Sequence, residues 1–240
     1  MNFWNKILNS KPKPLPMNNL SNHRTSFYFY FNLFILILAI GGFVINALVH
    51  PDTLPPASAL VYIHGVIMFL WYILIVVQSN LVRSRKISLH KKLGKSSLLL
   101  ALGIVITGIW MSMAHYSRPD GFLFSTINMF ILINFIILYS LALNNRHQSE
   151  FHKRYMTFAS LAAVFPALAR IILGLNLNEY LSVPLWILLV LVMGVFDLKS
   201  QKKIHSATII GSALIFLGIA LILVLMENAA WKEFLDRLMS

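Results

Sequence analysis

The stretch LVYIHGVIMFLWYILIVVQSNLV, residues 60–82, contains no Asp, Glu, Lys or Arg. An α-helix rises about 1.5 Å per residue, so about 20 apolar residues cross the roughly 30 Å hydrocarbon layer of a bilayer. The stretch is too continuously apolar for an amphipathic surface helix, and it lacks the alternation of a barrel strand. It therefore predicts a transmembrane helix.

Six further runs of the same kind lie along the chain. The predicted spans are 27–49, 60–82, 96–114, 122–143, 156–175, 181–196 and 207–226. The 240 residues are 58% hydrophobic and 12% charged, with a mean hydropathy of +0.74. This composition excludes a soluble nucleic-acid binder despite the net charge of +12, and the lack of cysteine excludes a disulfide scaffold. The predicted fold class is an all-α transmembrane bundle of seven helices.

The basic residues predict an orientation, because Lys and Arg in short loops are retained on the cytoplasmic side. Sixteen of the twenty lie on one set of helix ends, against Arg118, Arg170, Lys232 and Arg237 on the other. We expect a cytoplasmic N-terminus and an outer C-terminus, in a bacterial cytoplasmic membrane. No nucleic-acid partner is expected, since the positive charge follows the topology.

Three regions are predicted on this basis. Residues 1–26 are expected to form a cytoplasmic tether, because the run KPKPLP at residues 11–16 favours an extended, polar chain. Residues 27–226 form the membrane domain, whose first span is expected to be an anchor and not a cleaved signal. In residues 227–240, apolar and charged side chains alternate at helical spacing, which indicates a short helix in the outer interface.

A short repeat marks the inner helix ends. The sequence LHKK at residues 89–92 aligns with FHKR at 151–154, and each opens a span. A fainter third copy begins at His205, which precedes a Leu-Gly-Ile triplet by the spacing found after His90. We interpret spans two to seven as three parallel helical hairpins with one leading helix, since internal repeats are common in membrane bundles.

This topology sorts the histidines into two groups. The inner ends carry His90, His152 and His205, and the outer ends carry His50, His64 and His115. The helix between His64 and His90 separates them by about 25 to 30 Å, so they cannot share one metal ion or haem iron.

The inner group is open to three interpretations. His90 and His152 are candidate ligands of haem b. Alternatively, His90, His152, His205 and Asp197 form a possible zinc set, although the surrounding positive charge disfavours a bare cation. The third interpretation is a rim for lipid phosphate at helix N-termini, with Ser88 and Ser149 as N-caps. The basic residues of that rim are Arg83, Arg85, Lys91, Lys92, Lys153 and Arg154.

The outer half offers two polar positions inside the spans. His64 is expected to face the bundle interior, as a haem ligand with a partner such as His115 or as a donor to a carbonyl or tyrosine. Arg170 either extends to the surface or holds an anionic group in the interior.

Other polar and aromatic residues are expected to serve packing. Amides such as Gln78 and Asn128 are predicted to hydrogen-bond between helices. Trp110 and Trp186 fall near outer helix ends, as interfacial belts do. Trp71 lies within a span, where it packs in the bundle or lines a cofactor.

A spaced set of residues carries a resemblance to a known group. The set is His64-Gly65, Trp71, Gln78, Arg83, His90-Lys91, Gly94, His152-Lys153-Arg154 and Arg170. Over residues 60–235 the chain resembles uncharacterised bacterial multi-pass membrane proteins with this signature, which implies no specific activity. A looser resemblance of architecture, to b561-type membrane cytochromes, implies haem bound by histidines on a helical bundle.

Three functions follow as hypotheses. The first is a redox protein that binds haem b and exchanges electrons with a quinone. The second is a non-enzymatic lipid-binding or assembly protein, and the third is a metal-dependent membrane hydrolase that uses the histidine and Asp197 set. No P-loop, nucleophile elbow or dinucleotide fingerprint occurs in the sequence.

Overall fold

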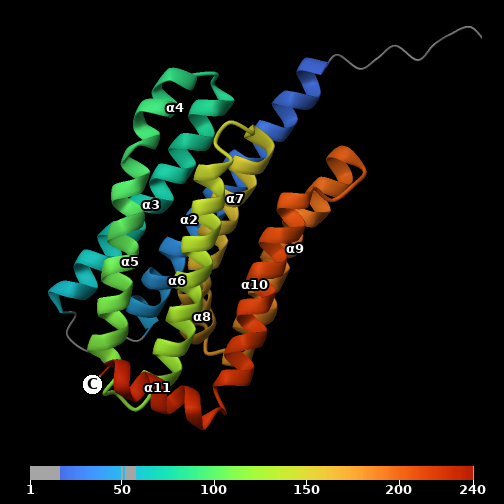
Figure 1. Cartoon of the computed structure of the whole chain (residues 1–240). Coiled ribbons are helices and arrows are strands. Elements are labelled where there is room, and N and C mark those ends of the chain that lie inside the picture. Colours follow the sequence, from blue (N-terminus) through green and yellow to red (C-terminus); the bar gives the residue numbers. More distant parts are fainter. Residues whose placement is uncertain (1–16, 50, 52–57, 240) are drawn as a thin grey trace, which may run out of the picture.

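Residues 17–49, 51 and 58–239 are described by a computed structural model, and side chains are described from Ser26 onward. These residues are helical almost throughout and contain no strand (Figure 1). The helices are α2 (Met17–Val49), α3 (Ala59–Arg83), α4 (Ile87–Gly94), α5 (Ser96–His115), α6 (Gly121–Asn144), α7 (Ser149–Ala163), α8 (Phe165–Gly174), the 3-10 turn η2 (Glu179–Leu181), α9 (Ser182–Gln201), α10 (Ser206–Leu225) and α11 (Ala229–Met239).

The helices match the predicted spans. Six segments are long and apolar enough to cross a membrane, and α7 with α8 makes a seventh if this bent pair counts as one span. Helices α4 and α5 together form one of the six, Ile87–His115. The all-α, multi-span architecture predicted from the sequence is therefore confirmed at this level.

Some predicted boundaries differ from the observed ones. Of the predicted tether, residues 1–16 lie outside the described residues, whereas residues 17–26 belong to α2. The predicted N-caps are wrong, because Lys86 precedes α4 and Gln148 precedes α7, and neither side chain caps its helix. Several polar residues lie close together at each of these helix starts, so the sequence offered more than one possible N-cap.

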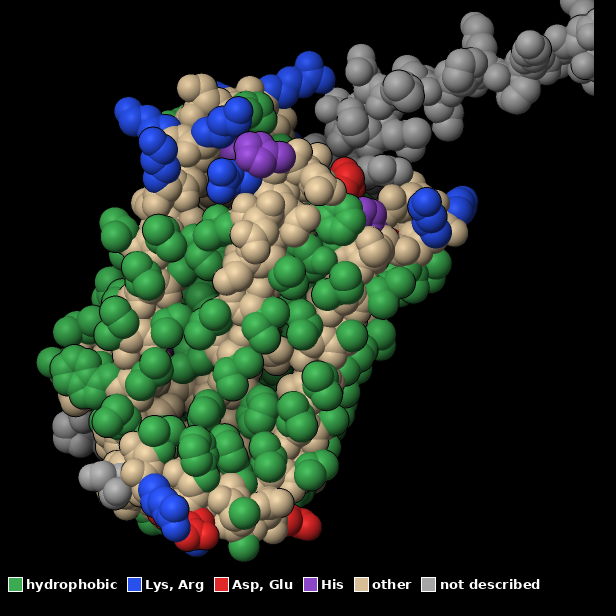
Figure 2. All heavy atoms as spheres, viewed as in Figure 1, with side chains coloured by type: hydrophobic (Ala, Val, Ile, Leu, Met, Phe, Trp, Pro, Cys, Tyr) green, Lys and Arg blue, Asp and Glu red, His purple; other side chains and the backbone are tan. Residues whose placement is uncertain are grey.

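The bundle has two different ends and an apolar middle. Figure 1 shows α4 at one end and α11 lying across the other. Figure 2 shows blue and purple side chains gathered near α4, a broad green belt, and a few charged groups at the end where α11 lies. We call these the basic end and the α11 end.

Helix α11 is attached to the bundle by specific contacts. Leu235 is fully buried. The indole N–H of Trp231 donates to Thr126 Oγ1 at 3.1 Å, and the Tyr116 hydroxyl donates to Asp236 at 2.7 Å. Phe234 and Leu238 remain about half exposed, which leaves an apolar strip suited to a membrane interface.

The core is built from aromatic and small side chains. Trp71 is fully buried, its ring meets Phe135 edge to face at 5.0 Å, and its indole N–H donates to Ser160. Trp71 thus packs within the bundle. At the crossing of α2 and α8, a Cβ on Gly42 would collide with the backbone of Ala167, so this approach requires glycine.

The helix pair α7 and α8 bends by 43° at its break. Pro166 lies just after the break and has no N–H to donate, which is a common cause of helix bending. Two carbonyls before the break accept side-chain hydrogen bonds: Ser160 from the Tyr72 hydroxyl at 3.3 Å, and Leu161 from the Trp186 indole at 2.7 Å. Trp186 is therefore a buried core residue, and its predicted place in an interfacial belt is wrong.

Replacing Trp186 with Phe is expected to destabilise the protein, because the Leu161 carbonyl loses its indole donor in an apolar environment. We expect a loss of about 1 kcal/mol in the free energy of unfolding, seen as a lower melting temperature in detergent. Trp110→Phe is the matched control, since Trp110 is 57% exposed. Equal effects of the two substitutions would contradict a role for Trp186 at the bend.

Candidate functional site

The basic end is formed by the α3–α4, α6–α7 and α9–α10 turns. Its exposed cations are Arg83, Arg85, Lys86, Lys91, Lys92, Lys95, Arg146, Lys199, Lys202 and Lys203. Four predicted lipid contacts, Arg83, Arg85, Lys91 and Lys92, belong to this surface. Arg83 also lies over the Phe29 ring at 4.4 Å, which ties it to α2.

Two predicted cofactor ligands come together at this end. His90 on α4 and His152 on α7 have ring centroids 6.3 Å apart and ring planes at 85°. His152 Nδ1 lies 2.8 Å from the Ala142 carbonyl and donates to it, because a carbonyl only accepts. The free ring nitrogen of His152 is therefore Nε2. Nδ1 of His90 is buried and has no hydrogen-bond partner among the described residues.

Gln78 adds an unpaired amide to the same place. Its side chain is 8% exposed, and neither its Oε1 nor its Nε2 has a partner among the described groups. The His90 ring lies beside the backbone of Gln78, and a Cβ on Gly94 would be 3.5 Å from Gln78 Nε2. Buried polar groups without partners are costly, so this amide is a strong indication of a missing polar partner.

The hydroxyl groups of Ser97 and Tyr139 connect the group formed by Gln78, His90 and His152 to the core. The Ser97 hydroxyl donates to the Gly94 carbonyl at 2.7 Å, and its oxygen lies 2.8 Å from the Tyr139 hydroxyl. The Ser97 hydrogen is used by Gly94, so Tyr139 is the donor to Ser97. The Tyr139 ring contacts Trp71 edge to face at 5.6 Å. We call Gln78, His90 and His152 the inner polar cluster.

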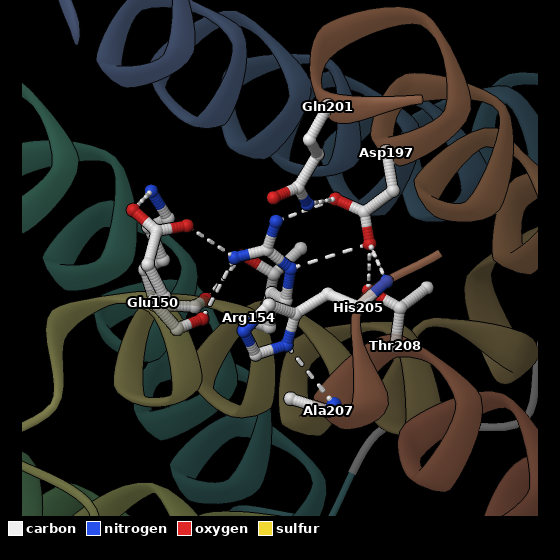
Figure 3. A network of polar contacts seen from close by, with 9 residues as sticks. Glu150, Arg154, Asp197, Gln201, His205, Ala207 and Thr208 are labelled. Carbon is white, nitrogen blue, oxygen red and sulfur yellow. Dashed lines mark hydrogen bonds and ion pairs between the residues drawn. The ribbon is translucent and has the colours of Figure 1, made fainter. Parts of the chain in front are cut away.

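A second group of polar contacts joins α7, α9 and α10 (Figure 3). Arg154 and Asp197 are both almost fully buried and form an ion pair of 2.5 Å. Arg154 also donates to Glu150 at 2.6 Å, while Asp197 accepts from the Thr208 hydroxyl at 2.5 Å. Gln201 donates to the same carboxylate at 2.8 Å. Through its ion pair with Asp197, Arg154 thus links helices inside the bundle. The sequence analysis had predicted it to be a lipid contact, which the structure does not support.

His205 closes this group at the start of α10. Its ring Nδ1 accepts from the Ala207 N–H, so His205 itself is the N-cap, and its own N–H donates to Asp197 at 3.1 Å. Burial lowers the pKa of His205, and the charge of Arg154 lowers it further. The ring stays neutral at neutral pH, which the capping bond requires.

The predicted zinc set is divided between these two groups. His90 and His152 are neighbours, but the Asp197 carboxylate is occupied by Arg154, Thr208 and Gln201. Within the described part of the chain, no three His, Asp or Glu side chains are placed to hold one ion. A metal at Asp197 would have to displace a buried arginine.

The outer histidines have different hydrogen-bond partners. His64 contacts Thr107 on α5 at 2.8 Å, whereas His115 lies eight residues further along the same helix and contacts its own Met111 carbonyl. Eight residues correspond to about 12 Å along a helix, so the two histidines make their contacts on different turns of α5. His50 lies outside the described residues, as does the side chain of His23.

Sequence reasoning missed two features of the site. Gln78 was expected to bond between helices, as Asn128 does with Gly108 and Ser112 on α5. Whether the Gln78 amide has a hydrogen-bond partner depends on the side chains of the neighbouring helices, and the sequence does not show which side chains these are. The partner of Asp197 was also missed, although an acid near the end of an apolar span is itself a signal for a buried ion pair.

Comparison with known proteins adds no family to this description, because no family model, no curated protein and no solved structure matches the chain.

Substituting Arg154 with Met should destabilise the protein strongly, because it leaves the Asp197 carboxylate buried without its cation. We expect a loss of about 3 to 5 kcal/mol in the free energy of unfolding, measured by denaturation in detergent. The double variant Arg154→Met, Asp197→Asn should lose less, since the charge is gone and the amide oxygen still accepts hydrogen bonds.

Arg237→Met is the matched control, because Arg237 forms a pair of equal length with Glu233 that is exposed. Its effect should be below about 1 kcal/mol. A comparable loss in both single variants would show that burial does not govern the strength of the Arg154 pair.

Proposed function

We propose that this multi-pass membrane protein binds haem b between His90 and His152 and transfers electrons. The separation of the two rings, 6.3 Å between centroids, is the observation that carries the proposal. Two imidazoles that bind one iron from opposite sides need centroids about 6 Å apart, from two metal–nitrogen bonds of about 2 Å each and the two ring radii.

The state of the ring nitrogens supports this assignment. The Ala142 carbonyl fixes His152 so that Nε2 is free, and a backbone carbonyl behind the ring is the usual support of a metal-binding histidine. Because α4 and α7 supply one histidine each, His90 and His152 would bind from two separate elements, as ligands in helical bundles do.

The surrounding charge favours haem over a bare divalent cation. The cations of the basic end repel a free metal ion, whereas the two propionate groups of a haem are carboxylates that Lys and Arg bind well. The unpaired amide of Gln78 would give a further donor to such a carboxylate. Haem supplies one-electron chemistry when bound, and a quinone in the bilayer is the proposed electron partner.

The tyrosine and tryptophan beside the cluster would exclude water from its inner side. Trp71 is fully buried and Tyr139 nearly so; Tyr139 hydrogen-bonds to Ser97, and Trp71 packs against the Tyr139 ring. A low-dielectric wall on one side and cations on the other would set the potential of a redox group. The chain's own contribution is therefore binding, orientation and electrostatic tuning.

The proposed topology places the basic end in the cytoplasm, with the N-terminus inside and the C-terminus outside. Its support is the concentration of exposed Lys and Arg at one end of the bundle. Three parallel hairpins behind α2 remain part of the proposal: α3 packs against α5 and α6 against α7, whereas α10 packs more extensively against α6 and α7 than against α9. The localisation that follows is a bacterial cytoplasmic membrane.

Absorption spectra of the purified full chain test the haem proposal. Protein produced with an ample haem supply should show the bands of a low-spin, bis-histidine haem b, and His90→Ala or His152→Ala should remove them. His147→Ala is the control, because His147 is exposed at the same end and outside the cluster. Melting temperatures establish that each variant is folded.

Two results would overturn the haem assignment. One is folded wild-type protein that takes up no haem, which would favour the alternative of a non-enzymatic lipid-binding or assembly protein. The other is a low-spin spectrum that survives in both histidine variants.

Reporter fusions test the orientation. A reporter after Ser200 should be active on the cytoplasmic side, and one after Ser240 on the outer side, because the last span lies between them. Equal location of both reporters would contradict a crossing by α10, and exchanged locations would reverse the polarity.

A further inference from the structure

The start of α10 is held by a histidine that acts as a hydrogen-bond acceptor (Figure 3). The His205 ring Nδ1 accepts from the Ala207 N–H at 3.1 Å, and the His205 carbonyl accepts from the N–H groups of Thr208 and Ile209 at 2.9 and 3.1 Å. The usual N-cap residues are Ser, Thr, Asp and Asn, whose oxygens accept hydrogen bonds throughout the neutral range. An imidazole differs from them, because Nδ1 accepts only while it carries no proton.

Protonation of this ring removes the cap. A protonated imidazole carries hydrogens on both nitrogens, so Nδ1 and the Ala207 N–H become two donors that face each other. The N-terminus of a helix also carries a partial positive charge, which repels a cation at this position. The His205 side chain is only partly buried, so a proton reaches the ring without unfolding of the bundle.

The charges around the ring largely cancel one another. Two cations and two anions act on it from both neighbouring helices: Arg154, Lys153 and Glu150 on α7, and Asp197 on α9. These four groups are joined in ion pairs. Helix α6, which also packs against α10, has no charged residue, and its Tyr139 hydroxyl is bonded to Ser97 on α5. Capping and burial therefore decide the protonation state of His205.

The cap should weaken in mild acid. His205 lies in the turn between two spans, where burial lowers its pKa from the ordinary value of 6.5 and the charge of Arg154 lowers it further. Between the lowered value and 6.5, the unfolded chain binds a proton that the folded protein does not bind. The stability that the cap contributes is thus complete above this range and is lost as the pH falls through it.

The first turn of α10 also holds Asp197. The His205 N–H donates to Asp197 Oδ2 at 3.1 Å, and the Thr208 hydroxyl donates to the same oxygen at 2.5 Å. The link between α9 and α10 is only four residues long, from Lys202 to His205, and Lys202 has a left-handed backbone with φ of 60°. This conformation is costly for a residue other than glycine, so the contacts of the turn must maintain it.

We propose that His205 is a pH-sensitive switch of the α9–α10 turn. The neutral ring keeps the first turn of α10 closed, and protonation opens this turn and withdraws its two donors from Asp197. The buried pair of Arg154 and Asp197 keeps the bundle folded in the open state. The switch goes beyond the proposed haem function and does not depend on it.

Hydrogen–deuterium exchange of the purified full chain, in detergent and without added haem, tests the switch. Exchange of the amides of residues 205–210 is measured at about pH 7.5 and about pH 5.5, on either side of the range in which a histidine titrates. Each rate is divided by the intrinsic chemical rate at that pH, which gives a protection factor. The protection factor of the wild type should fall about fivefold in acid, the effect typical of losing an N-cap.

Variants separate the cap from the other titrating groups. His205→Asn keeps an acceptor that does not titrate, so its protection should be equal at the two pH values. His205→Ala has no capping side chain and should show the low protection at both. His147→Asn is the matched control, because His147 is an exposed histidine at the same end and its replacement should leave the wild-type response unchanged.

Two results would overturn the switch. One is equal protection of the wild type at both pH values. The other is a fall in folded His205→Asn as large as that of the wild type, which would assign the response to another group. Melting temperatures establish that each variant is folded, and neither result bears on haem uptake by His90 and His152, which is measured separately.

Discussion

Inside a bilayer, a backbone N–H or C=O has no water to bond, so the chain itself must satisfy every one of them. Long helices meet this constraint along each straight span. At the bend before Pro166 the regular pattern is interrupted, and the Tyr72 hydroxyl and the Trp186 indole donate to carbonyls there. The aromatic core around α7 therefore has a second role besides packing, because it completes the hydrogen bonding of a broken helix.

Because of the same constraint, the polar side chains fall into two groups. Some pair with one another and stabilise the bundle, and others have no hydrogen-bond partner and are available to a ligand. Arg154 and Asp197 neutralise each other and bind α7, α9 and α10 together at the basic end. Asp197 is consequently unavailable to a metal. Gln78 and Nδ1 of His90 lack partners in the described part of the molecule, so the available chemistry lies between α3, α4 and α7. This division is the physical reason for placing a cofactor there.

The two ends of the bundle differ in charge and in geometry. The basic end combines exposed cations with a pair of facing imidazoles, an arrangement suited to a flat cofactor that carries carboxylates. At the other end, α11 covers part of the bundle, and Arg170 on α8 is half-buried and donates to the Pro166 carbonyl. The proposed haem thus belongs to the basic end of the protein.

The sequence alone determined that the chain forms several apolar helical spans, because each span must be apolar along its own length. The sequence also showed that Lys and Arg are concentrated at one set of helix ends, since these residues cluster in the loops themselves. Which side chains the histidines meet was decided only by the tertiary structure: His90 lies near His152, while His64 and His115 contact different partners. Such contacts depend on the rotation and tilt of helices that are distant in the chain, and these follow from packing at positions such as Gly42 and Ala167. Periodicity records which side chains share a helix, but the partner of a side chain is set by the helix that packs against it.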